Sequence, residues 1–338
     1  MREARLTVRA CGPLVSYQDG GRFGMLRFGV PASGAMDRLA HAAAQIALGR
    51  PEGATAIEVS LGGLALVCDT GEVTCCVTGG GFQVVLNGAV SPSWCVRTLR
   101  AGDELAIRPG PWGSWACLAF LGTLVCPSWA GSTATHVASG LGGGLLARGA
   151  TVVVRGAEVL AEREGLLPVS DLARARPQVR VVLGPQTERF APEAVARFLS
   201  TRFAVTPAVD RMGMRLAGPV LPLRDALSIP SEPLVRGAVQ VNGEGVASVL
   251  LADHQTTGGY PKIATILSSD LDGVAQLRPG DTLAFQAVTA EEAVRIVRAQ
   301  AQAKRTFLRD IAQPRGSLAA LEARLWRENL VSGMVNLP

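Results

Sequence analysis

The amino-acid sequence predicts a mostly-β protein of the sandwich or barrel type, and three observations support this fold class. Short apolar stretches alternate with polar residues in the two-residue period of a strand, as in AIEVSLGGLALV at residues 56–67. Glycine and proline, with 39 and 20 residues, lie between these stretches, where they are typical of turns. Segments with the period of a helix are few, so we expect strands to form most of the core.

Length and composition limit the classes of protein to which the chain can belong. Its 338 residues suffice for two or three domains, and 48% hydrophobic against 18% charged residues predicts a large buried core. The formal net charge is +5, but the basic residues are scattered and aromatic residues make up only 5%. A nucleic-acid groove needs clustered Lys and Arg with stacking rings, so we expect none.

The first half of the chain contains predicted strands and one helix. Ile57 and Val59 alternate with polar residues, as in a half-buried strand. The stretch FQVVLNGAV, residues 82–90, predicts a strand that reaches a hairpin turn at Asn87-Gly88. The stretch DRLAHAAAQIALG, residues 37–49, predicts a helix that begins after Asp37 and ends at Gly49.

The second half continues in the same style. Strands are predicted at VRVVLGP, SVLLAD and KIATIL, which are residues 179–185, 248–253 and 262–267. A helix is predicted at 191–200, because Pro192 lies in its first turn. The tail from residue 290 to about 328 predicts two helices broken at residues 314–316.

One phrase occurs twice and suggests a duplication. LRAGDELAI begins at Leu99 and LRPGDTLAF begins at Leu277, and each is a polar turn that leads into a strand. The second copy lies far enough along the chain to belong to a second β module. We place the boundary between the two modules near residues 175–178.

The cysteine, histidine and charge patterns lead to expectations about the redox compartment, metal binding and membrane insertion. The seven cysteines are odd in number and form no CxxC, so we expect free thiols in a reducing cytoplasm. None of the three histidines has a metal-ligand spacing, and we expect no metal site. Residues 109–147 carry no Asp, Glu, Lys or Arg, but their prolines and glycines favour buried strands and turns over a membrane helix. The first residues show no signal peptide.

Two stretches carry residues suited to binding an anion. FGVPASGAMDR, residues 28–38, leads into a helix whose free N–H groups could hold an anion, or which is simply capped. In VDRMGMRLAG, residues 209–218, Asp210 and Arg211 would point to opposite faces of a strand. Arg211 is then either a fork for a carboxylate or phosphate or part of a solvated pair.

A third stretch is HQTTGGYPK, residues 254–262, which lies between two apolar segments. It offers two threonine hydroxyls, a tyrosine, a lysine, and two glycines that let the backbone approach a ligand or adopt a positive φ. It is no Walker A motif, and the chain has no GxGxxG that joins a strand to a helix and no GxSxG elbow. Alone, the loop is a glycine-rich connection of low specificity.

Several motifs together resemble one known family. The stretches YQDGGRFGMLRFGVPASGAMDRLA, AIEVSLGG, VVLGPQTERF, DRMGMRLAGP, SEPLVRGAVQV, DHQTTGGYPKIATILSSDL and QLRPGDTLAF occur in this order, and the chain ends with ENLVSGMV. They resemble the family of the 5-oxoprolinase C subunit, also called allophanate hydrolase subunit 2 or biotin-dependent carboxyltransferase-like. The resemblance implies two cyclophilin-like β-barrel domains at residues 1–176 and 177–289, with a few short helices, and a helical tail at 290–338.

The resemblance also implies a function. The family's complex opens the lactam of 5-oxoproline to L-glutamate with ATP, and this chain would act in it with a B subunit of related fold and a third lactam-utilisation subunit. ATP would belong to the complex and not to this chain alone. One alternative is a carboxyltransferase that acts on urea or a similar small amide, with biotin on a partner because no MKM motif occurs here. The other is an inactive regulatory or binding homologue.

The family's cleft would be built from the three stretches. The expected catalytic residues are Asp210, Arg211, Thr257 and Lys262. The expected substrate-binding residues are Ser33, Asp37, Glu58, Gln255, Thr256, Gly258, Gly259 and Tyr260. Their donors would stabilise a carbonyl oxygen that becomes anionic, and a cation would hold a carboxylate-like group.

The chain also departs from the family at three positions. Gly81 stands where members commonly have Asp, and the segment around Thr133 lacks a usual Arg. Asn242 stands where proline is usual. The missing Asp and Arg suggest either the loss of one ion pair or a changed substrate.

Overall fold

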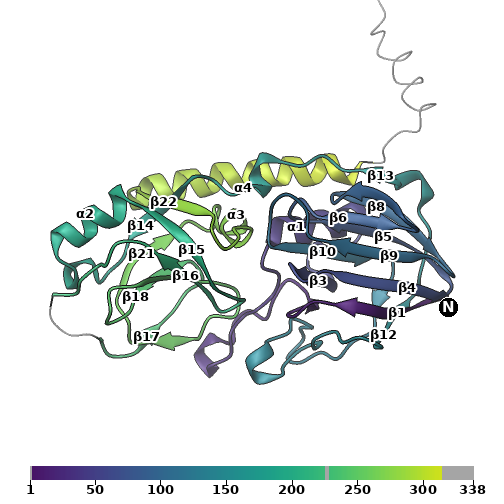
Figure 1. Ribbon diagram of the computed structural model, residues 1–338, viewed down its shortest axis with the longest axis horizontal. Helices are drawn as coiled ribbons and strands as arrows, with labels where there is room; N and C mark the ends of the chain where they lie inside the picture. The colour runs from purple at the N-terminus through teal and green to yellow at the C-terminus, as the bar shows by residue number, and fades with distance from the viewer. Residues whose placement is uncertain (1, 225–227, 314–338) are drawn as a thin grey trace, which may run out of the picture.

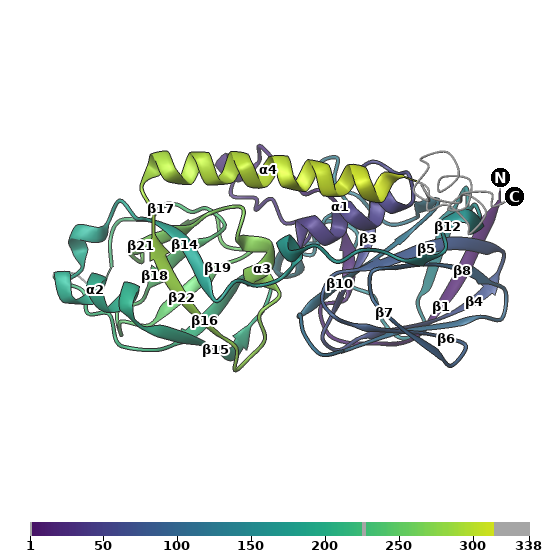
Figure 2. The same cartoon turned by 90° about the horizontal axis from the view of Figure 1, so that it is seen from above.

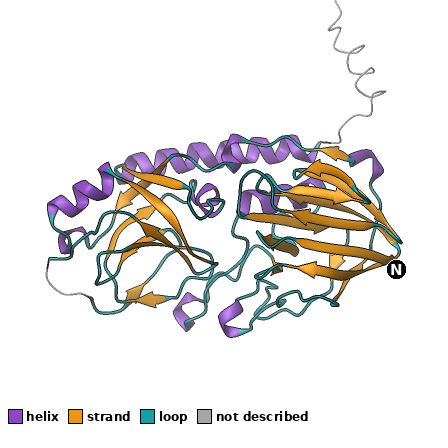
Figure 3. Ribbon diagram, viewed as in Figure 1, coloured by secondary structure: helices purple, strands orange, loops and turns teal. Residues whose placement is uncertain are grey.

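The computed structural model describes residues 2–224 and 228–313. Figures 1 and 3 show two β modules side by side and a long helix, α4, that lies across both. Figure 2 gives the same arrangement from above, where α4 spans the N-terminal and the C-terminal module. The mostly-β fold class is confirmed.

The N-terminal module consists of two antiparallel sheets. The first has the strand order β11(Thr123–Leu124), β12(Thr151–Arg155), β1(Glu3–Cys11), β4(Leu64–Thr70), β9(Glu104–Arg108), β6(Gln83–Leu86), β7(Ala89–Pro92). The second has the order β13(Gly165–Leu166), β8(Cys95–Arg100), β5(Glu72–Thr78), β10(Trp115–Phe120), β3(Ala56–Ser60), β2(Ser16–Gln18).

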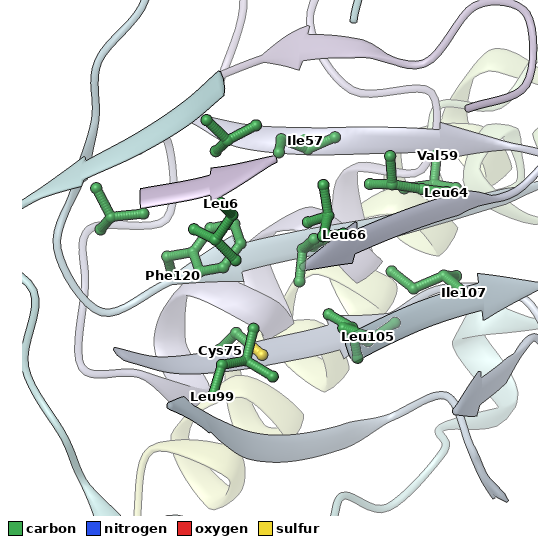
Figure 4. Close-up of a cluster of buried hydrophobic side chains, with 14 of the residues drawn as sticks. Leu6, Ile57, Val59, Leu64, Leu66, Cys75, Leu99, Leu105, Ile107 and Phe120 are labelled. Atoms are coloured by element: carbon green, nitrogen blue, oxygen red, sulfur yellow. The ribbon is translucent and has the colours of Figure 1, made fainter. Parts of the chain in front are cut away.

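The two sheets enclose one apolar core. Leu6 and Leu66 from the first sheet and Ile57 and Phe120 from the second are at most 2% exposed and belong to one cluster (Figure 4). Strand alternation directs these side chains inward, which explains why the two-residue period predicted the strands. Burial of such apolar area is the main favourable term in folding.

The C-terminal module is a closed barrel of seven strands. Their order is β14(Gln178–Leu183), β21(Lys262–Ile266), β18(Ala238–Val241), β19(Ala247–Leu250), β16(Gly213–Ala217), β15(Arg202–Val209), β22(Thr282–Ala287). The parallel pair β14–β22 closes the barrel. A separate small sheet pairs β17(Glu232–Pro233) with β20(Thr257–Gly258).

Local sequence signals account for the helices. Asp37 caps α1(Arg38–Ala47) by accepting from Ala40 N at 2.8 Å, and α2(Pro192–Ser200) has its proline in the first turn, as predicted. The short helix α3(Leu271–Ala275) was not predicted. The tail forms α4(Ala290–Ala312), and the predicted break at 314–316 and second tail helix lie outside the described residues. The 3-10 helices are η1(Leu26–Phe28), η2(Val137–Ser139), η3(Ala161–Arg163), η4(Asp171–Ala173) and η5(Thr187–Arg189).

Two predicted turns have the expected geometry. Asn87 and Gly88 join β6 to β7 with φ of 50° and 84°, as a two-residue hairpin turn requires. In the repeated phrase, Asp103 accepts from Arg100 N at 2.6 Å and Asp281 accepts from Arg278 N at 2.8 Å. The glycine of each copy has a similar φ, 94° and 93°. The repeat is therefore a shared turn into a strand, and the superposition of whole modules stays a prediction.

Two further sequence expectations concern thiols and membranes. The seven cysteines, which all lie in the described residues, form no disulfide, and five of them are buried. Within the described part of the chain, every helix is too short or too polar to cross a membrane.

Candidate functional site

A buried arginine joins the two modules. Arg211 donates from Nε and Nη2 to the two carboxylate oxygens of Asp253, at 2.8 and 3.0 Å. It also donates to Glu58 and, at 2.8 Å, to the carbonyl of Gly34, and these two residues belong to the N-terminal module. Because Arg211 is only 2% exposed, this seam cluster (Arg211, Glu58, Asp253 and Gly34) is closed to solvent.

The local chain explains why Arg211 points inward. Asp210 and Arg211 lie in the turn between β15 and β16, not on a strand as expected. Asp210 is exposed and accepts from Met212 N at 2.7 Å and Gly213 N at 3.1 Å, which fixes the turn. The two side chains do point in opposite directions. The expectation of Arg211 as an open fork for a substrate is wrong, because two protein carboxylates occupy it.

In the seam cluster, burial and the neighbouring charges shift the pKa values in opposite directions. Burial raises the pKa of Glu58, against the Arg211 guanidinium and the Met36 N–H, which lower it. Burial acts to lower the pKa of Arg211, but the carboxylates of Glu58 and Asp253 outweigh it and raise that pKa. Arg211 therefore stays charged, and its charge makes the burial of two carboxyl groups tolerable.

Asp37 belongs to a second buried contact between the modules. Besides capping α1, it accepts from Gln276 Nε2 at 2.7 Å, and Gln276 also accepts from the backbone of Ser114 and Trp115. Burial, and then the charge of Asp272, raises the pKa of Asp37 to about 7. Asp37 is thus placed as a helix cap in the interface, rather than on an open surface.

Ser33 lies beside the seam in a strained conformation. It is 3% exposed, has a φ of 54°, and its hydroxyl has no hydrogen-bond partner among the described residues. The next residues are held by Arg236, which donates to the carbonyl of Ala35 at 3.1 Å and to that of Met36. Burial, followed by the charge of Arg38, lowers the pKa of Arg236 to about 10. The backbone before α1 is therefore held by Arg211 at Gly34 and by Arg236 at the next two residues.

The loop at residues 254–262 begins beside the seam cluster and ends at Lys262, the first residue of the barrel strand β21. His254 follows Asp253, is 5% exposed, and donates from Nδ1 to the carbonyl of Gln255 at 2.7 Å. Burial, more than the nearby charge of Arg236, lowers the pKa of His254. Further along, Gln255, Thr257 and Tyr260 are exposed and Thr256 is half-buried. The role of these side chains in binding a substrate stays a prediction.

Lys262 ends the loop in an ion pair that sequence reasoning missed. Its Nζ donates to Glu232 Oε2 at 2.9 Å, and Gln186 donates to the same oxygen at 2.7 Å. Lys262 is buried, whereas the Glu232 side chain is 45% exposed. The hydrogen bond from Lys262 lowers the pKa of Glu232. Glu232 and Gln186 lie in SEPLVRGAVQV and VVLGPQTERF, so the family motifs contained a signal for both.

The two loop glycines are required by close approach and not by a positive φ. Neither has a φ in the left-handed region. A Cβ on Gly259 would lie 2.7 Å from the backbone carbonyl of Ile229, and one on Gly258 would lie 2.9 Å from the Leu234 side chain. The segment that ends in β17 therefore packs directly on the loop.

The structure therefore separates the expected site residues into two groups. Arg211, Glu58 and Asp37 lie in the closed seam, with Ser33 beside it. Lys262 is buried at the end of the loop with Glu232 and Gln186, while Gln255, Thr257 and Tyr260 of the loop are exposed. Asp210 joins neither group.

The departures from the family have separate local explanations. Gly81 donates to the carbonyl of Trp112 at 2.7 Å, and a Cβ there would lie 2.4 Å from the Trp112 indole. Thr133 is bound to Asp19 near Gln18, at the opposite end of β10 from Trp112. Strands rise by about 3.3 Å per residue, so Gly81 and Thr133 are too far apart for one ion pair. That interpretation of the missing Asp and Arg is wrong.

The third departure lies in the turn between β18 and β19. The side chain of Asn242 accepts from Val246 N at 2.9 Å, and its own N–H donates to the carbonyl of Val246 at 3.1 Å. A proline has no N–H and could not make the second bond. Asn242 therefore holds the hairpin in a way that proline cannot.

Comparisons with known proteins decide the family. A model of the carboxyltransferase domain, subdomains A and B, matches residues 28–287. The chain belongs to the carboxyltransferase-domain family. The 5-oxoprolinase C subunit of Haemophilus influenzae is 34% identical to it over 286 residues, 84% of this chain and 91% of that protein. The urea amidolyase of Saccharomyces cerevisiae is 28% identical over 306 residues, 83% of this chain and 16% of that protein.

Solved structures of other proteins share the fold of this carboxyltransferase-domain chain. TTHA0988 is 30% identical with a TM-score of 0.75, over 84% of this chain and 55% of that one, so this chain spans about half of its length. The urea amidolyase of K. lactis has a TM-score of 0.80 at 24% identity, over 91% of this chain and 20% of that one, which shows the fold alone. The resemblance to the family of the 5-oxoprolinase C subunit is confirmed.

The two groups of residues differ in what they can do chemically. The seam cluster is closed and holds two carboxyl groups on one guanidinium, so it fixes the modules and the base of the loop. The loop presents exposed hydroxyl and amide groups, and its strand β20 pairs with β17, whose Glu232 binds the ammonium of Lys262. Among the described residues, no group of three or more His, Cys, Asp or Glu is placed to hold a metal ion.

Proposed function

We propose that this chain is one of the subunits of an ATP-dependent 5-oxoprolinase, in which it acts with a B-subunit homologue and a third subunit. The observation that carries the proposal is the polar loop at residues 254–262, which ends in the Lys262–Glu232 pair. The family to which the chain belongs and its 34% identity to a 5-oxoprolinase C subunit support the same proposal. ATP would bind to the complex and not to this chain alone.

The loop suits the chemistry of a lactam. 5-Oxoproline has a carboxylate and an amide carbonyl, and this carbonyl becomes more anionic when it is activated or attacked. Thr257 and Tyr260 offer hydroxyl donors. An ammonium group has three N–H donors, and Glu232 accepts one of those of Lys262. Such preorganised donors are worth about 2.7–4 kcal/mol each in a transition state.

The seam cluster would position this loop. Asp253, held by Arg211, is the residue that precedes the loop. Arg211 and Asp37 would therefore act on catalysis only through the position of other groups. This differs from the expectation that both contact the substrate.

The test uses the complex reconstituted with the two other subunits from the same genome. With ATP and 5-oxoproline, Thr257→Ala and Lys262→Met should each lower glutamate release at least tenfold, which corresponds to about 1.4 kcal/mol or more. Lys262→Met keeps the apolar stem and removes the charge. The matched control is Thr70→Ala, since Thr70 is an exposed threonine on β4. Unchanged turnover in both loop variants would contradict the proposal.

The second candidate function is a carboxyltransferase that acts on urea or a similar amide. The family description and the 28% identity to a urea amidolyase favour it. Urea with a carboxylated biotin carrier is therefore assayed in parallel with 5-oxoproline. Turnover that depends on the carrier would select this candidate. A complex that forms but turns over neither substrate would select an inactive binding homologue.

A further inference from the structure

Two loops of the N-terminal module form a single projecting surface. Arg22, which is 3% exposed, donates to the carbonyls of Trp129 at 3.2 Å and Ala134 at 2.9 Å. Asp19 accepts from Ser132 Oγ at 2.8 Å and Thr133 N at 2.7 Å. We call residues 20–34 and 122–147 the loop platform. In Figure 1, η1 and η2 from its two segments project on the same side of the molecule.

The surface of the loop platform is apolar. Seven large apolar side chains are more than a third exposed: Phe23 (68%), Phe28 (63%), Leu145 (49%), Leu26 (42%), Val125 (40%), Trp129 (40%) and Val137 (37%). Within residues 2–224 and 228–313, no hydrogen bond or ring contact joins any of them to the loop at 254–262 or to the seam cluster. The proposed catalytic site therefore does not explain why these apolar side chains are exposed.

The loop platform is also depleted of charge. Residues 122–147 contain no Asp, Glu, Lys or Arg, and residues 20–34 contain only Arg22 and Arg27. Since Arg22 is buried, Arg27 is the one exposed charge of the platform, and its guanidinium lies 4.7 Å from the centre of the Phe28 ring. Exposed loops normally carry charges, whereas aromatic enrichment with charge depletion is typical of the centre of a protein interface.

The charge pattern indicates what kind of partner covers this surface. A symmetric contact between two copies would place the platform against itself. The platform contains no acidic residue, so Arg27 would meet no carboxylate there. The nearest acid in sequence, Asp19, is already bonded within the platform. A different polypeptide, with an apolar patch and an acidic side chain, fits better than a second copy.

We infer that the loop platform is the docking surface for the B-subunit homologue of the complex. This inference rests on the proposed function for the existence of that partner, but its location on this chain comes from the platform alone. The platform includes Ser33 and Gly34, and the carbonyl of Gly34 accepts a hydrogen bond from Arg211. Docking would therefore adjoin the segment that joins the two modules.

The experiment measures binding of the purified B-subunit homologue from the same genome to the full chain, by calorimetry and sizing chromatography. Phe23→Ser with Phe28→Ser should weaken binding at least 100-fold, and Arg27→Glu should weaken it about tenfold or more. The melting temperature of the isolated chain should not fall, because these side chains are exposed. The control is Val90→Ser with Val294→Ser, which alters apolar residues that are 65% and 51% exposed elsewhere.

Each outcome supports or overturns the inference. Binding by the double phenylalanine variant as strong as that of the wild type overturns it, and so does the absence of wild-type binding. Loss of self-association in that variant, with binding of the B-subunit homologue kept, assigns the platform to a second copy instead. A platform-dependent complex without 5-oxoprolinase turnover leaves the docking surface standing and removes the proposed function. If the complex turns over 5-oxoproline but its assembly is unaffected by these variants, the proposed function stands and the docking surface is wrong.

Discussion

Replacing Arg211 by methionine tests whether the seam cluster holds the modules together. The variant keeps an apolar stem but leaves the carboxylates of Glu58 and Asp253 buried without the guanidinium that pairs with them, at 4% and 2% exposure. Removing one partner of a buried ion pair lowers the free energy of unfolding by about 3–5 kcal/mol. We expect a loss of this size at pH 8, measured by urea unfolding.

The loss should depend on pH in a defined direction. Burial already raises the pKa of Glu58 in the presence of Arg211, and without the guanidinium the rise is larger. A carboxyl group with a raised pKa binds a proton in the folded state that the unfolded chain releases, so stability increases as pH falls. The deficit of Arg211→Met relative to the wild type should therefore shrink between pH 8 and pH 5.

A triple variant separates charge from packing. Arg211→Met combined with Glu58→Gln and Asp253→Asn removes the unpaired charges, and it should regain part of the lost stability at pH 8. The reasoning is refuted if Arg211→Met unfolds within about 1 kcal/mol of the wild type at pH 8, on the scale given above. It is also refuted if the deficit is constant with pH or if the triple variant is no more stable than the single one.

Three further predictions concern single positions. Because the pKa of Asp37 is raised to about 7, the protein should lose stability as pH rises from about 4 through 7. Asp37→Asn keeps a capping side chain, and its stability in urea unfolding should depend less on pH than that of the wild type. Identical pH profiles for the two proteins would contradict this. Gly259→Ala brings a Cβ within 2.7 Å of the Ile229 carbonyl, so thermal unfolding should show a loss of about 1–3 kcal/mol, and an unchanged melting temperature would disprove the close approach. Gly81→Asp should destabilise through the clash with Trp112, and calorimetry should show partial recovery when Trp112→Ala is added; additive losses would argue against the clash.

The local structure could be predicted from the sequence alone. Alternation placed the strands, Asp37 placed the start of α1, and Asn87-Gly88 placed a hairpin turn with two positive φ angles. Each of these signals acts within a few residues, where capping and turn geometry depend on side chains next to each other. The polar loop at 254–262 was recognisable for the same reason, since its donors are contiguous.

The roles of the charged residues could not be predicted, because they depend on contacts made by the folded chain. Arg211 meets Glu58 across 153 positions of the sequence, and Gln276 meets Asp37 across 239. Lys262 meets Glu232 because β17 pairs with β20 in the middle of the loop. Such pairings follow from how strands and modules pack, and an arginine in a turn has the same local sequence whether it faces solvent, a substrate or two buried carboxylates. Burial and the partner's identity decide between these outcomes, and both are properties of the folded chain.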